Sequence, residues 1–549
     1  MSLQGLMQSG QLLISGVLRH AAAHHGDVEI VSQLYGGEQR RSNWRTVERR
    51  ARKLAGALNS AGIKASDRVV TLAWNTDRHL ELYYAVAGMG AVIHTVNPRL
   101  FPEQISYIVN HAAGETLFFD LDFAELVVKI APDLRQVKRY VALCHKDQLP
   151  SLSLPGLCAY EELLEEGADT YTWPEFAETT ASSLCYTSGT TGNPKGVLYS
   201  HRSTVLHCFA ACAVDGLGLC ANDSVLLVVP MFHVNAWGIP YAAAMCGAKL
   251  VLPGATLSGD RLFALTRDEG CTLSLGVPTI WLGFFQYIEQ NPEIDLKPLR
   301  LERVVIGGAA APRAIIEKFE HMLGVFVIQA WGMTETSPLA TIANLLPRHA
   351  GQSLEKRFDV QGRQGRAIYG VEIAIFDSDG TMLPNDGKRV GELRVRGPWV
   401  LSAYFGNEPG SALNDDGWFS TGDVAYIDAD GYVQITDRSK DVIKSGGEWI
   451  SSIDLENVAL GHPKVHEAAV IGVAHSKWQE RPLLIIVPKG GEAPTEEEIL
   501  GYMKDRVARW WLPDEVVFFE ELPHTATGKL LKVALREKFK EHRLSTDLA

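Results

Sequence analysis

Short apolar runs alternate with amphipathic stretches through the first two thirds of the chain. Residues 14–62 have the periodicity of helices and include a basic amphipathic run from Arg45 to Asn59. A helix is also predicted at 78–89, between two short apolar runs. Strand, helix and strand at this spacing indicate parallel strands that are covered by helices. The predicted strands are 67–73, 91–93, 116–119, 139–143, 183–186, 196–199, 224–229, 249–252, 273–277, 303–306 and 325–329.

The pattern changes after about residue 360, where short strands and turns replace the longer alternation. Strands predicted at 370–376, 391–396 and 431–436 indicate a small antiparallel β subdomain at about 360–437. A charged stretch at 437–448 follows, and we interpret it as an interdomain linker.

The final part of the chain is predicted to form a small α+β unit. Its predicted elements are a helix at 452–460, strands at 465–473 and 482–487, a helix at 495–507 and a strand at 515–519. The chain is therefore expected to fold as an N-terminal domain of residues 1–439 and a C-terminal domain of residues 440–549.

The composition is that of an ordinary globular protein, with 46% apolar and 21% charged residues. A chain of 549 residues is longer than one hydrophobic core usually supports, which agrees with at least two domains. The formal net charge of −13 argues against nonspecific nucleic-acid binding. No apolar run approaches the ~20 residues of a membrane helix, and no signal peptide is recognised. Eight cysteines without a CxxC pair indicate a reduced, cytoplasmic protein.

The stretch SLCYTSGTTGNPKGVLYSH, residues 183–201, lies between two predicted strands and is suited to bind an anion. Its glycines allow backbone N–H groups to converge on a ligand, and its lysine supplies a mobile positive charge. It is not a Walker A loop, because Asn193 and Pro194 separate Gly192 from Lys195. A polar surface turn is the alternative for a loop of this composition. The candidate phosphate-binding residues are Thr187, Ser188, Gly189, Thr190, Thr191, Gly192 and Lys195.

Several later segments place polar or aromatic residues where predicted strands end, which is where α/β sheets hold ligands. PMFHVNAWG follows the strand at 224–229 and offers His233 and Trp237. IGGAAAP begins at the end of the strand at 303–306, and its small residues would let a flat group approach the backbone. QAWGMTET contains Trp331, which could stack on a purine. The plainer interpretation of each of these residues is a core or helix-capping side chain.

Three motifs lie nearer the C-terminus. They are DGWFSTGD at 416–423, DRSKDVIKSGGE at 437–448 and LPHTATGK at 522–529. In the first, the carboxylate of Asp423 can accept hydrogen bonds from both hydroxyls of a ribose. In the last, Gly528 shapes a turn that projects Lys529, which outside this context would be an ordinary surface residue.

In this order, the motifs resemble those of the adenylate-forming enzymes, which include acyl-CoA synthetases, peptide-synthetase adenylation domains and luciferases. The loop at 183–201 resembles the family's phosphate loop, and LPHTATGK resembles its catalytic-lysine loop. QAWGMTET resembles the YGxTE motif, with Trp331 in place of Tyr. PMFHVNAWG and LPHTATGKLLK are most similar to medium-chain fatty-acid and 3-methylmercaptopropionate CoA ligases. The resemblance covers essentially the whole chain.

The resemblance implies an α/β fold. A large N-terminal domain of two layered, mostly parallel sheets with helices would carry a small β-barrel subdomain. A small, mobile α+β domain would follow and turn about a hinge at Lys440.

The resemblance also implies a role for each candidate residue. Lys529, Thr334, Glu335 and His233 would be catalytic, and Thr190 and Glu335 would hold Mg²⁺. ATP or AMP would contact the phosphate loop together with Gly308, Ala309, Ala330, Trp331, Gly332, Asp423 and Arg438. The acid would lie among His233, Trp237, Val277, Gly308, Trp331 and Met333, and CoA would contact Lys444, Gly446, Gly447 and Trp449.

The implied reaction converts a carboxylic acid and ATP to acyl-AMP and pyrophosphate, and then transfers the acyl group to CoA with release of AMP. The apolar pocket favours a medium-chain, short aliphatic or thioether acid, and a long-chain or aryl acid is the alternative within the family. A luciferase-like oxygenase and a non-enzymatic binding protein are alternatives from other classes. The expected partners are the acid, ATP and CoA, with no nucleic acid and no transmembrane segment. A homodimer is an open alternative to a monomer.

Overall fold

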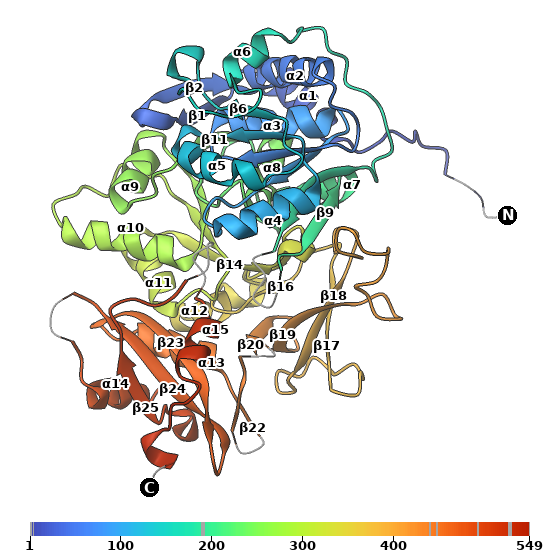
Figure 1. Cartoon of the computed structure of the whole chain (residues 1–549). Helices are drawn as coiled ribbons and strands as arrows, with labels where there is room; N and C mark the ends of the chain where they lie inside the picture. Colours follow the sequence, from blue (N-terminus) through green and yellow to red (C-terminus); the bar gives the residue numbers. More distant parts are fainter. Residues whose placement is uncertain are drawn as a thin grey trace.

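The structure of the protein is a computed structural model (Figure 1). It describes residues 3, 5–187, 193–438, 441–445, 448–490, 493–524 and 530–547, with the backbone alone at 448, 449 and 545. Two large sheets with their helices form most of the N-terminal domain. A four-stranded antiparallel sheet lies below them in Figure 1, beside the smaller C-terminal domain in red.

The first large sheet has nine strands and is parallel at its centre. Its edge strand β2 pairs antiparallel with β1, and β15 pairs antiparallel with both of its neighbours. In spatial order the strands are β16 (Arg366–Ala367), β15 (Leu339–Ile342), β14 (Phe326–Gly332), β13 (Arg303–Ile306), β12 (Leu273–Gly276), β10 (Ser224–Leu227), β11 (Lys249–Leu252), β1 (Glu29–Gln33) and β2 (Gln39–Asn43).

The second large sheet has seven strands, and all its pairings are parallel except that of β9 with β8. In spatial order the strands are β7 (Cys158–Ala159), β6 (Arg139–Ala142), β5 (Thr116–Phe119), β3 (Arg68–Leu72), β4 (Val92–Thr95), β8 (Ala181–Tyr186) and β9 (Gly196–Ser200). The two layered, mostly parallel sheets that the sequence predicts are therefore confirmed.

Successive side chains of a strand point to opposite faces, so each sheet is packed on both sides. In β10, Val225 and Leu227 belong to the core that the two sheets share, whereas Leu226 belongs to the outer core of the first sheet. In β3, Val69 faces the shared core and Val70 faces the outer core of the second sheet. The result is a stack of five layers in which helices alternate with sheets.

The helices are distributed over these three cores. The shared core contains α1 (Ile14–His24), α2 (Trp44–Ser60), α3 (Asp77–Gly88), α6 (Tyr160–Glu165), α7 (His201–Cys212) and α8 (Ile239–Cys246). The outer layers contain α4 (Pro102–Ala112) and α5 (Ala124–Ile130) on the second sheet, and α9 (Gly259–Asp268), α10 (Pro278–Gln290), α11 (Arg313–Lys318) and α12 (Leu354–Gln361) on the first. In the ranges that the structure describes, no helix is long and apolar enough to cross a membrane.

The continuous helical pattern predicted for residues 14–62 is wrong in its middle, where β1 and β2 form an antiparallel hairpin. Gly36 and Gly37 make the turn with φ values of 75° and 84°, which favour glycine. A Gly-Gly pair between two strand-length segments is a hairpin signal that the helical pattern on either side obscured. The chain re-enters a helix at Asn43, whose side chain caps α2 by accepting a hydrogen bond from the Thr46 amide.

The predicted β subdomain is an antiparallel sheet with its own small core. Its strands are β17 (Glu372–Phe376), β18 (Gly391–Arg396), β19 (Phe419–Ile427) and β20 (Val433–Arg438), paired in that order. Among the described residues no pairing joins β20 back to β17, so the barrel closure that we predicted is not shown.

The C-terminal domain is a five-stranded sheet with helices on both faces. The strands are β21 (Ile443–Ser445), β22 (Glu448–Ile450), β23 (Val465–His475), β24 (Gln479–Pro488) and β25 (Glu515–Phe518). Helices α13 (Ser452–Leu460) and α14 (Glu496–Met503) pack on one face, and α15 (Lys532–Lys538) packs on the other. The helix predicted at 495–507 therefore ends earlier, at Met503.

Candidate active site

The predicted phosphate loop connects β8 to β9, which pair antiparallel. Its two ends are tied together, because the Thr187 amide donates to the Lys195 carbonyl at 2.9 Å and the Lys195 amide donates to the Thr187 hydroxyl at 3.3 Å. The predicted residues Ser188, Gly189, Thr190, Thr191 and Gly192 lie outside the described residues. The side chain of Lys195 is exposed, as expected of a group that meets a solvated phosphate.

Tyr404 connects this loop to the predicted metal ligand. The Lys195 ammonium lies 4.8 Å from the centre of the Tyr404 ring, and the Tyr404 hydroxyl donates to Oε1 of Glu335 at 2.8 Å. Burial and the nearby Glu335 carboxylate raise the pKa of Tyr404, which keeps the phenol protonated as a donor. We did not identify Tyr404 in the sequence because it lies in a segment without a recognised motif.

Glu335 is the predicted ligand for Mg²⁺, and this role stays a prediction. Its backbone is in the short turn Thr334–Thr336, and 7% of the residue is exposed. The Tyr404 hydroxyl fixes one carboxylate oxygen. No group of three or more His, Cys, Asp or Glu side chains suited to a metal occurs in the described part of the chain. One carboxylate completed by phosphate oxygens and water is a common way in which proteins bind Mg²⁺.

Trp331, Asp423 and Arg438 come together from three strands. The Trp331 indole donates to Oδ2 of Asp423 at 3.2 Å, and Nε of Arg438 lies 2.9 Å from Oδ1. Asp423 and Arg438 are direct partners in the pairing of β19 with β20. The geometry therefore joins motifs that are 92 residues apart in the sequence. The assignment of Asp423 to the ribose stays a prediction.

The glycines after β13 leave room beside Trp237. A β-carbon added at Gly307 would lie 3.0 Å from the Trp237 ring and 3.0 Å from the Ala330 carbonyl oxygen, so even alanine would require these neighbours to shift. Gly308 has φ of +79° and is exposed, as is Ala309. Trp237 and Ala330 therefore lie beside the end of β13, where the nucleotide is predicted to bind. The two residues come from different motifs.

The PMFHVNAWG segment contains an unusual left-handed turn. Residues 234–238 all have positive φ, between 47° and 76°. Each non-glycine residue in this region costs about 1–2 kcal/mol, so the turn needs support from outside. The Asn235 side chain donates to the Ser183 hydroxyl at 2.7 Å, and the Met231 amide donates to Oδ1 of Asn75 at 2.7 Å. Backbone strain of this kind occurs where a site must hold a fixed shape.

The remaining acyl-pocket predictions lie around the same region. His233, Trp331 and Met333 are half-buried, and Trp331 and Met333 pack against the shared core. Gly332 ends β14, next to Trp331. The depth of the pocket stays a prediction.

A cleft of about 310 Å³ lies between the two domains. Val277, Gly308, Ala309 and Arg438 line it from the N-terminal side. His524 and Leu530, which flank the segment 525–529, line it from the C-terminal side. Lys529 itself lies outside the described residues. The cleft nevertheless shows that the predicted nucleotide residues and the two ends of the catalytic-lysine segment face each other.

The predicted CoA residues belong to the first hairpin of the C-terminal domain. Lys444 in β21 pairs with Trp449 in β22, and the Lys444 side chain is exposed. Gly446 and Gly447, and the predicted hinge Lys440, lie outside the described residues. The structure thus places Lys444 and Trp449 on one hairpin, while their role in binding CoA stays a prediction.

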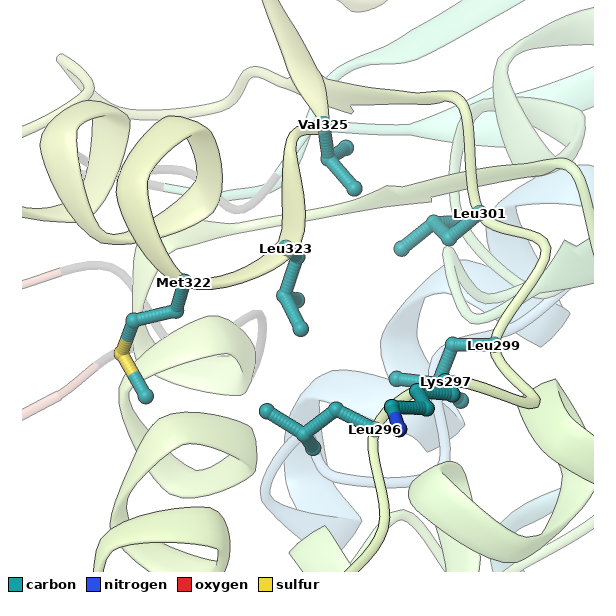
Figure 2. A pocket seen from close by; sticks show the side chains of 7 residues that line it. All are labelled: Leu296, Lys297, Leu299, Leu301, Met322, Leu323 and Val325. Carbon is teal, nitrogen blue, oxygen red and sulfur yellow. The ribbon is translucent and has the colours of Figure 1, made fainter.

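A second cavity, of about 300 Å³, lies away from these residues (Figure 2). Figure 2 shows Leu323 and Val325 pointing toward the opening from one side, and Leu296 and Leu301 from the other. Lys297 is the charged member of its lining, and no predicted site residue contributes to it.

Comparison with known proteins identifies the family of the chain. Residues 18–405 match the AMP-binding enzyme family, and residues 454–529 match the AMP-binding enzyme C-terminal domain. A medium-chain-fatty-acid–CoA ligase of Ectopseudomonas oleovorans is 52% identical over 535 residues, which cover 97% of both chains. A 3-methylmercaptopropionyl-CoA ligase of Ruegeria lacuscaerulensis is 52% identical over 537 residues, which cover 98% of this chain and 99% of that one.

A solved structure shows the same fold at lower sequence identity. The anthranilate CoA ligase AuaEII in complex with anthranoyl-AMP superposes with a TM-score of 0.84 at 24% identity, covering 96% of this chain and 97% of that one. The family match spans most of the chain, and the relatives are similar along their whole length. The protein described here therefore belongs to the AMP-binding enzyme family.

Proposed function

We propose that the protein is an ATP-dependent acyl-CoA ligase that activates an aliphatic or thioether carboxylic acid as acyl-AMP and transfers it to CoA. The main supporting observation is the interdomain cleft, where Gly308, Ala309 and Arg438 face the two residues that flank the segment of Lys529. The two ligases that are 52% identical over nearly the whole chain support the same activity.

In the first half-reaction, the carboxylate of the acid attacks the α-phosphorus of ATP. A bond forms between the carboxylate oxygen and this phosphorus, and the bond to the bridging oxygen breaks, so that pyrophosphate leaves. Both reactants are anions, and the site must offset their repulsion. We assign this task to Lys195 on the polyphosphate and to Lys529 between the carboxylate and the α-phosphate.

Glu335 is the residue that would hold Mg²⁺, together with Thr190 and the phosphate oxygens of ATP. When bound, the ion would neutralise polyphosphate charge and stabilise the departing pyrophosphate. The Tyr404 hydroxyl holds the Glu335 carboxylate in place. Because Tyr404 also contacts Lys195, it would align the two groups that share the polyphosphate.

In the second half-reaction, the CoA thiol attacks the acyl carbon, a thioester forms and AMP leaves. We assign this step to a second orientation of the C-terminal domain, reached by rotation about Lys440. That rotation would bring Lys444 and the backbone at 446–449 to the CoA. Thr334 and His233 would line the site in both orientations, since both belong to the N-terminal domain.

The hinge can be tested with Lys440→Pro. Proline fixes φ near −65° and restricts the pivot. We expect acid-dependent exchange between ATP and pyrophosphate to change little. Thioester formation should fall about tenfold or more, because few molecules would reach the second orientation. Lys440→Ala is the control, since it removes the charge and keeps the backbone free. If both half-reactions survive in the proline variant, the hinge lies elsewhere.

The preferred acid can be tested by measuring AMP release from ATP, Mg²⁺ and CoA with straight-chain acids from acetate to palmitate. We add 3-methylmercaptopropionate and benzoate to the series. We expect one maximum at a medium chain length and clear activity with the thioether acid, because Trp237 closes against Gly307 and limits the apolar space. A maximum at palmitate or benzoate would assign the protein to the long-chain or aryl ligases instead.

The same series decides between the reaction classes. Absence of AMP release with every acid, from protein that binds ATP, would contradict the ligase assignment. Light emission that depends on oxygen would then identify an oxygenase, and its absence would favour a binding protein.

We further propose a cytoplasmic location, which the eight free cysteine thiols support and cell fractionation tests. Sedimentation velocity would decide between a monomer and a homodimer.

A further inference from the structure

An ion pair contributes to the C-terminal wall of the interdomain cleft, at the start of α15. Nζ of Lys532 lies 2.7 Å from Oε1 of Glu456 in α13 and also donates to the Ser452 hydroxyl. The two charged side chains are only 11% and 13% exposed. The same Glu456 oxygen accepts the Val470 amide at 2.7 Å. Lys532 is thus held on more than one side, three residues after Lys529.

Hydrogen bonds from Ser452 extend this cluster across the domain boundary. The amide of Ser452 donates at 2.9 Å and its hydroxyl at 2.5 Å to Oδ2 of Asp437, which lies in β20 next to Arg438. Asp437 is 1% exposed. Arg536, one turn further along α15, forms an ion pair with Asp441. One connected set of contacts therefore joins β20 to the start of α15, three residues after Lys529.

If these contacts served only to stabilise the fold, the free energy lost by burying their charged groups would make them a poor choice. Burying a lysine and two carboxylates loses their hydration, and well-packed apolar residues often stabilise a protein as well or better. Polar clusters of this kind do specify one arrangement of the groups that they join. In this protein the arrangement is the one in which His524 and Leu530 face Gly308 and Ala309 across the cleft.

We propose that Lys532 is a positioning residue for the adenylation half-reaction, because it links the catalytic-lysine segment through Ser452 to Asp437 and so sets where Lys529 enters the cleft. This inference rests on the proposed function, in which Lys529 bridges the acid and the α-phosphate. Its proposed effect on the reaction is exerted through Lys529. In the second orientation the link to Asp437 opens, because Ser452 moves with the C-terminal domain.

The first test compares the two half-reactions in Lys532→Met. We expect acid-dependent pyrophosphate exchange to fall roughly 10- to 100-fold, the cost of displacing a reacting group by about 1 Å. Thioester formation from supplied acyl-AMP should change little. Lys532→Arg keeps the charge and should recover most of the exchange. Lys540→Met is the matched control, because the Lys540 side chain is 67% exposed and its change should affect neither half-reaction.

A second variant keeps the result interpretable if Lys532→Met does not fold. Burial raises the pKa of Glu456 to about 7 against the effect of Lys532, so loss of the lysine leaves a buried acid that would take up a proton. Ser452→Ala keeps the Lys532–Glu456 pair and the hydrogen bond from the backbone amide at position 452 to Asp437, and it removes the hydroxyl that connects Lys532 to Asp437. We expect it to lower exchange about tenfold without lowering the thioester step.

Lys529→Ala distinguishes failure of this proposal from failure of the proposed function. If Lys529→Ala keeps full exchange, the role assigned to Lys529 is wrong. If Lys529→Ala loses exchange while Lys532→Met and Ser452→Ala keep it, the positioning role is wrong and the proposed function stands. Equal loss in both half-reactions in the folded variants would show that the cluster is merely structural, which also overturns the proposal.

Discussion

Lys529→Ala is expected to lower acid-dependent pyrophosphate exchange roughly 100- to 1,000-fold, which is the usual cost of removing one group that stabilises charge in a transition state. The reason is that two anions must meet, and their repulsion must be offset where they make contact. Lys195 lies beside Tyr404 and Glu335, where the polyphosphate would bind. Only Lys529 is proposed to reach both the carboxylate and the α-phosphate.

The same variant should form thioester from supplied acyl-AMP at close to the original rate. After the pyrophosphate has left, no pair of anions needs to be joined, and the C-terminal domain is expected to have turned away. Both half-reactions can be followed on one preparation by radiolabelled exchange and by thioester absorbance. A parallel loss of the two activities would refute the assigned role, whatever its size.

Glu335→Gln is expected to lower adenylation about 100-fold and to raise the Mg²⁺ concentration needed for half-maximal rate. Glutamine keeps the size of the side chain and can still accept from the Tyr404 hydroxyl, so the turn at Thr334–Thr336 should remain folded. The charge that would hold the ion is lost. The measurement is the rate of exchange as a function of Mg²⁺ at fixed ATP.

Tyr404→Phe tests how the Glu335 carboxylate is aligned, separately from its charge. It leaves the Glu335 carboxylate and removes one hydrogen bond to it, so we expect a loss of about tenfold, consistent with a hydrogen bond to a charged group. The Mg²⁺ requirement should shift less than in Glu335→Gln. An unchanged Mg²⁺ dependence in Glu335→Gln would mean that the ion is held by other groups.

The layers of this protein were predictable because burial has a simple period along its strands. The side chains of Val225, Leu226 and Leu227 point alternately into two cores. Because both cores are apolar, the sequence shows this strand as a short apolar run between helices. The hairpin at 29–43 was not recognised, because β1 is buried along most of its length and lies between two strong helical patterns. Local periodicity could not distinguish such a buried strand from a continuation of the neighbouring helices.

Individual site residues were predictable where they belong to one continuous motif. They were less predictable where they act through contacts with residues that are distant in the sequence. Glu335 and Lys195 were identified separately, whereas Tyr404, which touches both, was missed. Asp437 was read as part of a charged linker, although it is buried and bonded to Ser452. Such residues gain their importance from a partner that is distant in the sequence, and no local pattern reports that partner.

The left-handed turn at 234–238 has a consequence for the order in which the protein assembles. The turn is unfavourable on its own, and its supports are Ser183 in the second sheet and Asn75 just after β3. Asn75 in turn donates to the carbonyls of Leu227 and Val229 at the end of β10 in the first sheet. Because these long-range contacts join both large sheets, we expect the turn at 234–238 to form only after the two sheets have docked. Local sequence alone would then be insufficient to form this turn in a nascent chain.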